Sequence, residues 1–183
     1  MISTSKVKLV MKRFTTIYFP VLLMVLTIAS ITQSSCGVYR FTDASVPDSI
    51  KTVRIRFIEN RAPYVNPQLS PTLTDRLRQK INNQTRLTQT NGDDAHYDIS
   101  GEIHEYSVTT SAISNKQEVM NRLTVRVKIT LNNQLANAVQ DIDVTRNYEF
   151  NANLSIQAAE AGILEEMVRS LTDDIFNRLF SKW

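Results

Sequence analysis

The stretch RLTVRVKITL, residues 122–131, shows the clearest regular pattern in the chain. Apolar and polar residues alternate along its whole length. The apolar residues are Leu123, Val125, Val127, Ile129 and Leu131, and the polar ones are Arg122, Thr124, Arg126, Lys128 and Thr130. Successive side chains of a β-strand point to opposite faces of a sheet, so this stretch predicts a strand with one buried and one polar face.

The same alternation marks three other segments. A strand that starts near Ser49 is predicted to bury Val53, Ile55 and Phe57. The other two strands bury Tyr97, Ile99, Gly101 and Ile103, and then Ile142, Val144, Tyr148 and Phe150, the last four opposite Asp141, Asp143, Thr145 and Glu149. Because this acidic row is predicted to lie beside the basic row of residues 122–131, charge pairs between neighbouring strands are expected.

Two segments follow the period of an α-helix instead. The first carries an apolar residue at every fourth position: Leu69, Leu73, Leu77 and Ile81. This spacing predicts an amphipathic helix to about Gln84, with Ser70 as N-cap before Pro71. The second is predicted to begin after the N-cap Ser155 and to run for nearly thirty residues. Its apolar residues are Ile156, Ala159, Ile163, Met167, Leu171, Ile175 and Leu179.

The order of these elements predicts the fold class. The dipeptide Asn91-Gly92 favours a hairpin that joins a short strand at 86–90 to the strand at Tyr97. The main elements then run β-α-β-β-β-α. We expect an α+β fold, a two-layer sandwich of a four-stranded, mainly antiparallel sheet with two helices on one face. The other face meets water or a partner, and residues 49–183 form a single domain.

The charge of the chain is unevenly distributed. The 183 residues include 21 Lys and Arg against 18 Asp and Glu, a net charge of +3, and the isoelectric point is about 9.1. Residues 1–35 contain Lys6, Lys8, Lys12 and Arg13 but no acid, and an apolar run follows at 14–31. Without this segment, 17 basic and 18 acidic residues remain. The basic balance therefore belongs to the N-terminal segment, and we expect no nucleic-acid partner.

The end of that segment resembles a bacterial lipoprotein signal. Ser34 and Ser35 precede Cys36, the only cysteine of the chain. The resemblance implies removal of residues 1–35, a diacylglycerol and an N-acyl chain on Cys36, and a lipidated tether at 36–48. The alternatives are an uncleaved transmembrane anchor, since about 18 apolar residues can span a bilayer, and a free thiol in a flexible segment. Gly37 follows the cysteine in place of an aspartate, which favours the outer membrane, and Met11 is an alternative start to Met1.

Familiar catalytic patterns are missing from the sequence. His96 and His104 are the only histidines, and on one strand they lie about 26 Å apart at roughly 3.3 Å per residue, too far to share a metal. No serine lies in a G-x-S-x-G setting, and the four glycines form no phosphate-binding loop. Adjacent acids such as Asp93-Asp94 are typical of solvated surface. We expect neither an enzyme nor a metal, and no cofactor beyond the acyl chains.

Six short stretches and the last residue together resemble a known family. They are CGVYRF at 36–41, NRAP at 60–63, QTRL at 84–87, GEI at 101–103, NRLTV at 121–125, DDIFN at 173–177 and Trp183. Their order and spacing resemble the Bacteroidota branch of the lipopolysaccharide-assembly lipoprotein family, LptE. The resemblance implies two helices on a four-stranded sheet. It also implies a plug and assembly factor of the outer-membrane β-barrel that translocates lipopolysaccharide, with direct binding of lipopolysaccharide or lipooligosaccharide.

Two sets of residues are candidates for contacts of this kind. Arg and Lys bind phosphate groups, so the outward cations are candidates for a lipopolysaccharide headgroup site: Arg54, Arg56, Arg122, Arg126 and Lys128. The alternative is a solvated face on which these cations pair with Asp141 and Asp143. Asn60, Arg61 and Tyr64, in a loop before the first helix, are candidates for contact with the barrel, or a plain surface connection.

A second function stays open at this point. The chain is also compatible with a free-standing periplasmic lipoprotein of the outer membrane that binds a small ligand or has a structural role in the envelope. The proteins that copurify with the chain would separate these two functions, because only the first requires a large β-barrel.

Overall fold

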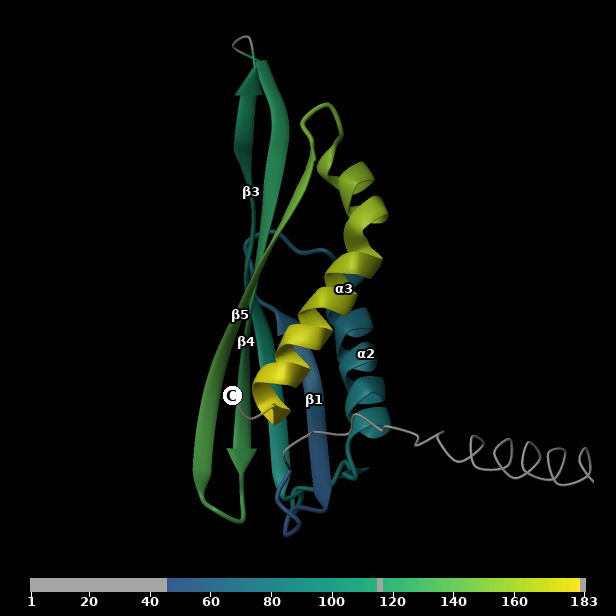
Figure 1. The fold of residues 1–183 in the computed structure, drawn as a ribbon, viewed down its shortest axis with the longest axis vertical. Helices are drawn as coiled ribbons and strands as arrows, with labels where there is room; N and C mark the ends of the chain where they lie inside the picture. The colour runs from purple at the N-terminus through teal and green to yellow at the C-terminus, as the bar shows by residue number, and fades with distance from the viewer. Residues whose placement is uncertain (1–45, 115–116, 182–183) are drawn as a thin grey trace, which may run out of the picture. The chain divides into compact units, whose positions relative to one another are not determined.

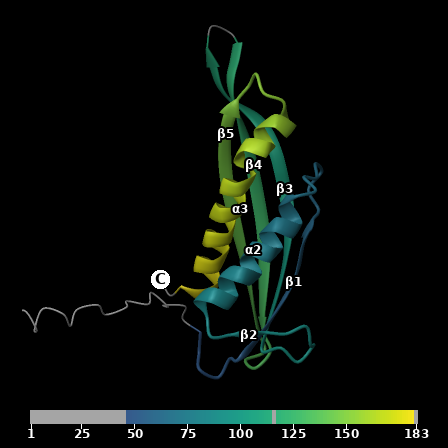
Figure 2. The same ribbon diagram turned by 90° about the vertical axis from the view of Figure 1, so that its right-hand side faces the viewer.

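The computed structural model describes residues 46–114 and 117–181. Cys36, the segment at 1–35, most of the predicted tether and Trp183 lie outside them. The elements are β1 (Thr52–Asn60), α2 (Leu69–Gln84), β2 (Thr88–Gln89), β3 (Tyr97–Ser114), β4 (Gln117–Asn133), β5 (Ala138–Asn151) and α3 (Ile156–Phe180). They form an α+β sandwich in which both helices cover one face of a sheet (Figures 1 and 2). The predicted fold class is confirmed.

The sheet has five strands, one more than predicted, in the order β2-β1-β3-β4-β5. The additional strand, β2, is only two residues long and pairs with β1 in parallel. β1 pairs with β3 in parallel, whereas β3, β4 and β5 are antiparallel. The sheet is therefore mixed, with its three longest strands antiparallel.

The prediction of a hairpin at Asn91-Gly92 that pairs β2 with β3 is wrong. β2 does not pair with β3, because β1 lies between them. The Thr90 N–H donates to the Val53 carbonyl, and the Gly92 N–H donates to the Thr90 hydroxyl. β2 is thus the edge strand beside β1, and the chain crosses the end of β1 to reach β3 on its other side.

The alternation along β4 and β5 is confirmed. The predicted inward residues of both strands are buried, and the register between the two strands is continuous. On β1 the prediction fails after Ile55, because the register with β3 shifts between Ile55 and Ile58. This bulge moves the inward position by one residue: Phe57 is 51% exposed, and Ile58, which is 1% exposed, takes its place in the core.

The helices bury the predicted stripes with one correction at an N-terminus. α2 buries Leu69, Leu73, Leu77 and Ile81 against the sheet, but Ser70 is not its cap. The Asn66 side-chain oxygen accepts the N–H groups of Gln68 and Leu69 instead, and Ser70 is buried inside the first turn. Ser155 caps α3 as predicted, since its hydroxyl accepts the Ala158 N–H.

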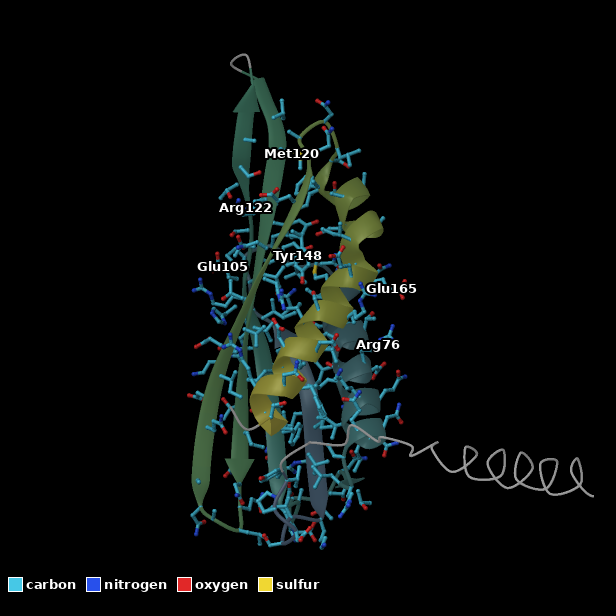
Figure 3. The ribbon with its side chains drawn as sticks, in the orientation of Figure 1. Arg76, Glu105, Met120, Arg122, Tyr148 and Glu165 are labelled. Carbon is cyan, nitrogen blue, oxygen red and sulfur yellow. The ribbon has the colours of Figure 1, made fainter. Side chains whose placement is uncertain are left out.

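α3 packs against β5 and α2 and closes the core. Figure 3 shows Tyr148 of β5 on the side of the sheet that faces α3, and Arg122 and Glu105 on the opposite side. Within residues 46–114 and 117–181, no helix has the length and apolar character needed to cross a membrane. One face of the sheet is thus covered by helices, and its other face carries the charged residues of the candidate site.

Candidate functional site

The structure brings the five predicted cations onto one face of the sheet, the face away from the helices. Arg54 and Arg56 lie on β1, and Arg122, Arg126 and Lys128 lie on β4. We call this surface the outer face. β3, which lies between β1 and β4, contributes acids to it.

Asp98 of β3 binds both arginines of β1. Its carboxylate accepts hydrogen bonds from Arg54 at 2.7 and 3.1 Å and from Arg56 at 2.6 and 3.0 Å. Burial raises the pKa of this carboxyl, but the hydrogen bonds and charges of Arg56 and Arg54 outweigh burial and lower the pKa to about 2. Arg54 also pairs with Asp93, and both hydrogen bonds raise the pKa of its guanidinium. The guanidinium groups of these two arginines therefore stabilise the fold through Asp98 and are less available to bind a ligand.

The three cations of β4 each face a carboxylate on a neighbouring strand. Arg122 pairs with Glu149 at 2.9 Å, Arg126 with Glu105 at 3.3 Å, and Lys128 with Asp141 at 3.2 Å. The expected cross-strand pairing is present, although Asp143 contacts His104 at 4.0 Å instead of the basic row. The three cationic side chains remain between 41% and 45% exposed, so a ligand can reach them from solvent.

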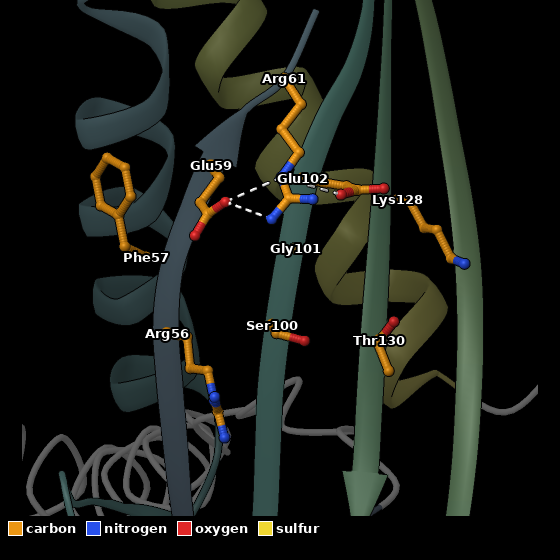
Figure 4. Close-up of a pocket in the computed structure, with 9 residues that line it drawn as sticks. All are labelled: Arg56, Phe57, Glu59, Arg61, Ser100, Gly101, Glu102, Lys128 and Thr130. Carbon is orange, nitrogen blue, oxygen red and sulfur yellow. Dashed lines mark hydrogen bonds and ion pairs between the residues drawn. The ribbon is translucent and has the colours of Figure 1, made fainter.

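A shallow pocket of about 400 Å³ lies on the outer face between the two groups of cations (Figure 4). Its lining residues are Arg56, Phe57, Glu59, Arg61, Ser100, Gly101, Glu102, Lys128 and Thr130. Gly101 lines this pocket with its backbone alone, because a Cβ there would point to the core side of the sheet and come within 2.6 Å of the buried Ile129 side chain. Glu59 and Glu102 face each other across β1 and β3, and Arg61 lies between them at 2.9 and 3.6 Å.

The three residues predicted to contact a barrel do not form one surface. Asn60 accepts the Ala62 N–H through its side chain. Arg61 reaches the outer face, as described above. Tyr64 lies on the helix side, where its hydroxyl is 3.3 Å from Glu160 and its ring stacks on Tyr106 at 5.5 Å. A role for these residues in partner contact stays a prediction.

A buried polar cluster beneath α3 escaped the sequence prediction. Glu160 is 8% exposed, and its carboxylate accepts the hydroxyl protons of Tyr106 at 2.6 Å and Tyr64 at 3.3 Å. Burial and the hydrogen bond to Glu160 raise the pKa of Tyr106. The sequence did hold a signal, because Glu160 lies four residues after Ile156 and three before Ile163, on the apolar side of the helix.

The described residues contain no group of three or more His, Cys, Asp or Glu side chains placed to hold a metal ion. His96 accepts the Lys51 N–H through Nδ1, and His104 lies beside Asp143. The arrangement on the outer face suits charge recognition: an array of exposed ion pairs over a rigid sheet.

Comparison with known proteins identifies the family. The model of the family described as LptE, Lipopolysaccharide-assembly, matches residues 50–179, which is nearly the whole described domain. The chain belongs to the LptE family. No curated protein matches the sequence.

Solved structures match this chain at low sequence identity. A Xanthomonas campestris protein of the DUF330 family is 9% identical, with a TM-score of 0.50 over 75% of this chain and 85% of that chain. This likeness supports the fold alone. Rare lipoprotein B from Shewanella oneidensis is 12% identical, with a TM-score of 0.39 over 70% and 90% of the two chains. PelC from Paraburkholderia phytofirmans is 15% identical, with a TM-score of 0.46 over 76% and 95%.

Proposed function

We propose that this LptE-family protein is an outer-membrane lipoprotein of the lipopolysaccharide translocon. In this proposal it acts as the plug and assembly partner of the translocon β-barrel and contacts the lipopolysaccharide headgroup. The role is one of binding and assembly, without catalysis. The observation that carries the proposal is the uncovered, charged outer face of the sheet in a chain of this family. A polar face of this kind suits the polar lumen of a large barrel.

The lipid anchor is the first part of the proposal. Acylation of Cys36 holds the domain at the periplasmic side of the outer membrane, since each buried methylene of an acyl chain contributes about 0.8 kcal/mol to membrane binding. A Cys36→Ser chain is expected to incorporate no radiolabelled palmitate and to leave the membrane fraction. Label that persists in this variant would place acylation elsewhere and contradict the anchor.

The barrel partner is the second part, and copurification tests it. An affinity-tagged chain is recovered from outer membranes solubilised in a mild detergent, and the bound proteins are identified by mass spectrometry. We expect a large β-barrel protein in near-equal amount. Recovery of the chain without any barrel would contradict the plug and favour the free-standing lipoprotein.

Surface delivery of lipopolysaccharide gives an independent test of the same function. Depletion of the protein is expected to leave newly made lipopolysaccharide or lipooligosaccharide accessible from the periplasm and missing from the cell surface. Unchanged delivery to the surface, measured by labelling of intact cells, would count against a role in the translocon.

A further inference from the structure

The two edges of the sheet differ in how far they are covered. At the β1 edge, β2 pairs with the first residues of the strand, and side chains of α2 take over from there. The Thr74 hydroxyl accepts the Ile58 N–H at 3.1 Å, and Arg78 donates to the Ile55 carbonyl at 3.0 Å. The backbone groups at this edge are therefore largely satisfied within the domain.

The opposite edge, formed by β5, is long, and no strand among residues 46–114 and 117–181 covers it. β5 is 14 residues long and is the last strand in the sheet order, with β4 as its neighbour on one side. The register with β4 has no bulge, and the Ala152 N–H extends it by donating to the Val119 carbonyl. In an antiparallel pair, alternate residues direct both backbone groups to the same side. Even-numbered residues of β5 thus pair with β4, and odd-numbered ones face the free edge.

Five successive odd-numbered residues direct their backbone N–H and C=O groups away from β4, to the free edge: Asp141, Asp143, Thr145, Asn147 and Glu149. Among the described residues, one hydrogen bond reaches these groups, from Arg178 to the Asp143 carbonyl at 2.6 Å. Its direction confirms that the Asp143 carbonyl points away from β4. A carbonyl oxygen has two lone pairs, so this contact does not by itself close the edge.

A groove of about 980 Å³ runs along the free edge beside the C-terminal half of α3. β5 forms one wall with residues 140–143, Thr145 and Arg146, and α3 forms the other with Asp174, Asn177 and Arg178. Two hydrogen bonds of 2.6 Å between Arg146 and Asp174 join the two walls. A free edge strand beside a helix is the arrangement in which an extended peptide adds a further strand to a sheet.

The charges on the outer row of β5 select the occupant, since the two cations that line the groove are bonded within the domain, Arg146 to Asp174 and Arg178 to the Asp143 carbonyl. The outer row of the strand carries Asp141, Asp143 and Glu149 and no cation. A second copy of β5 paired with this edge would gain no ion pair on that row, and most two-fold registers would bring carboxylates together. Asp143 is 61% exposed and lies 4.0 Å from the His104 ring, so its carboxylate is accessible to a partner. A strand with cations at alternate positions fits this row.

We propose that the open β5 edge and its groove bind an extended segment of a partner protein that carries Lys or Arg at alternate positions, added as a strand next to β5. This inference is independent of the lipopolysaccharide-assembly function proposed above. A partner peptide would gain backbone hydrogen bonds from the odd-numbered residues of β5 and a charge pair from Asp143. Asp141 would be shared between the peptide and Lys128, which lies 3.2 Å from it.

The test uses the full chain in a neutral detergent and a fluorescent nine-residue peptide of alternating lysine and threonine. A peptide of the same composition with its lysines in one block is the control probe. We expect fluorescence anisotropy to show saturable binding of the alternating peptide, at least tenfold tighter than binding of the block peptide. Hydrogen exchange measured by NMR should slow at the amides of Asp141, Asp143, Thr145, Asn147 and Glu149. Equal affinity for the two peptides, or no binding, would overturn the proposal.

A matched pair of variants separates strand addition from charge attraction. Thr145→Pro removes an outward N–H that β4 does not use, whereas Thr145→Val keeps that N–H and removes only the hydroxyl bonded by Arg126. The proline variant is expected to bind the alternating peptide at least tenfold more weakly, and the valine variant like the wild type. Unchanged binding in a folded proline variant would overturn the proposal.

A second variant keeps the test decisive if the proline disturbs folding. Asp141→Asn combined with Asp143→Asn removes two carboxylates and preserves their shape. The doubly substituted chain is expected to lose at least fivefold in affinity for the alternating peptide and to bind the block peptide as before. Equal affinity of this variant and the wild type for the alternating peptide would contradict the assignment of a basic partner.

Discussion

At the scale of single residues, Asp98 is the acid of the outer face that forms ion pairs with two arginines, Arg54 and Arg56. It is buried, and Arg56 and Arg54 lower its pKa from 3.8 to about 2. A carboxyl whose pKa is lower in the folded than in the unfolded state stabilises the fold above the unfolded value. That stabilisation is lost as the pH falls from about 4 to 2.

Replacing Asp98 with Asn is therefore expected to lower the free energy of unfolding at pH 7 by about 2 kcal/mol, because two guanidinium groups lose a charged acceptor. Chemical denaturation at a series of pH values checks this. The difference between wild type and variant should shrink as the pH falls from 4 towards 2. A difference that stays constant over this range would show that the charge of Asp98 is not the cause.

Gly101 is the other residue with a position-specific requirement. A Cβ at this position would lie 2.6 Å from Ile129 Cδ1 and 3.2 Å from the Lys128 carbonyl oxygen. Gly101→Ala is expected to destabilise the fold by about 1–2 kcal/mol, because the added methyl group would overlap the close-packed neighbouring strand β4. Gly162 of α3 is the matched control, because a Cβ there meets nothing within 4 Å. Gly162→Ala should stabilise the helix by up to about 1 kcal/mol. Thermal unfolding of both variants tests the pair, and a shift of the same sign would contradict it.

At the scale of elements, Glu160 connects three parts of the chain. Tyr106 of β3 and Tyr64 of the β1–α2 connection both donate to this buried carboxylate of α3. The cluster thus orients the first turns of α3 over the sheet. A buried carboxylate oxygen that loses its donor retains its desolvation cost, so the shorter bond is the more important one.

Tyr106→Phe is expected to lower the free energy of unfolding by about 1–3 kcal/mol, because it leaves a carboxylate oxygen buried without its donor. Tyr64→Phe is the control with the longer bond and should have the smaller effect. Urea denaturation measures both, and hydrogen exchange in the first turns of α3 should rise more in the Tyr106 variant. An equal or larger effect of Tyr64→Phe would contradict the ranking.

The element scale also shows why one strand was mispredicted. Alternation of apolar and polar residues identifies a strand but cannot show where a bulge inserts a residue. In β1 both Phe57 and Ile58 are apolar, so either could be the inward residue after Ile55. Phe57 fits the inward row of β1 by residue type, yet the shift in register before Ile58 places it outside. The turn dipeptide Asn91-Gly92 likewise predicts that β2 pairs with β3, because a turn signal indicates a local pairing and cannot reveal the parallel pairing of β2 with β1.

At the scale of the whole molecule, the outer face is balanced by charge pairs between strands. Arg122, Arg126 and Lys128 are each matched by one carboxylate. Exposed pairs of this kind contribute little to stability, typically below about 1 kcal/mol each. The three cations can therefore leave their carboxylates and bind a phosphate at a small cost in folding free energy.

Changing these three cations together to Ser is expected to weaken binding of fluorescently labelled lipopolysaccharide severalfold and to make the remaining binding less sensitive to salt. The matched variant changes their partners Glu149, Glu105 and Asp141 to the corresponding amides. Because it releases the same cations from pairing, it should bind more tightly than wild type. Wild-type affinity in both variants would show that the outer face is only a solvated surface.

The sequence by itself determined the element types, the buried rows of β4 and β5, the stripes of both helices and the two-layer arrangement. These follow from local periodicity, which depends only on the order of apolar and polar residues. Only the tertiary structure decided the strand order and the bulge in β1. It also decided which arginines bind Asp98, which tyrosines bind Glu160, and why the β1 edge is covered while the β5 edge is open. Each of these depends on residues that are distant in the chain, because register, burial and charge pairing arise when separate elements pack together.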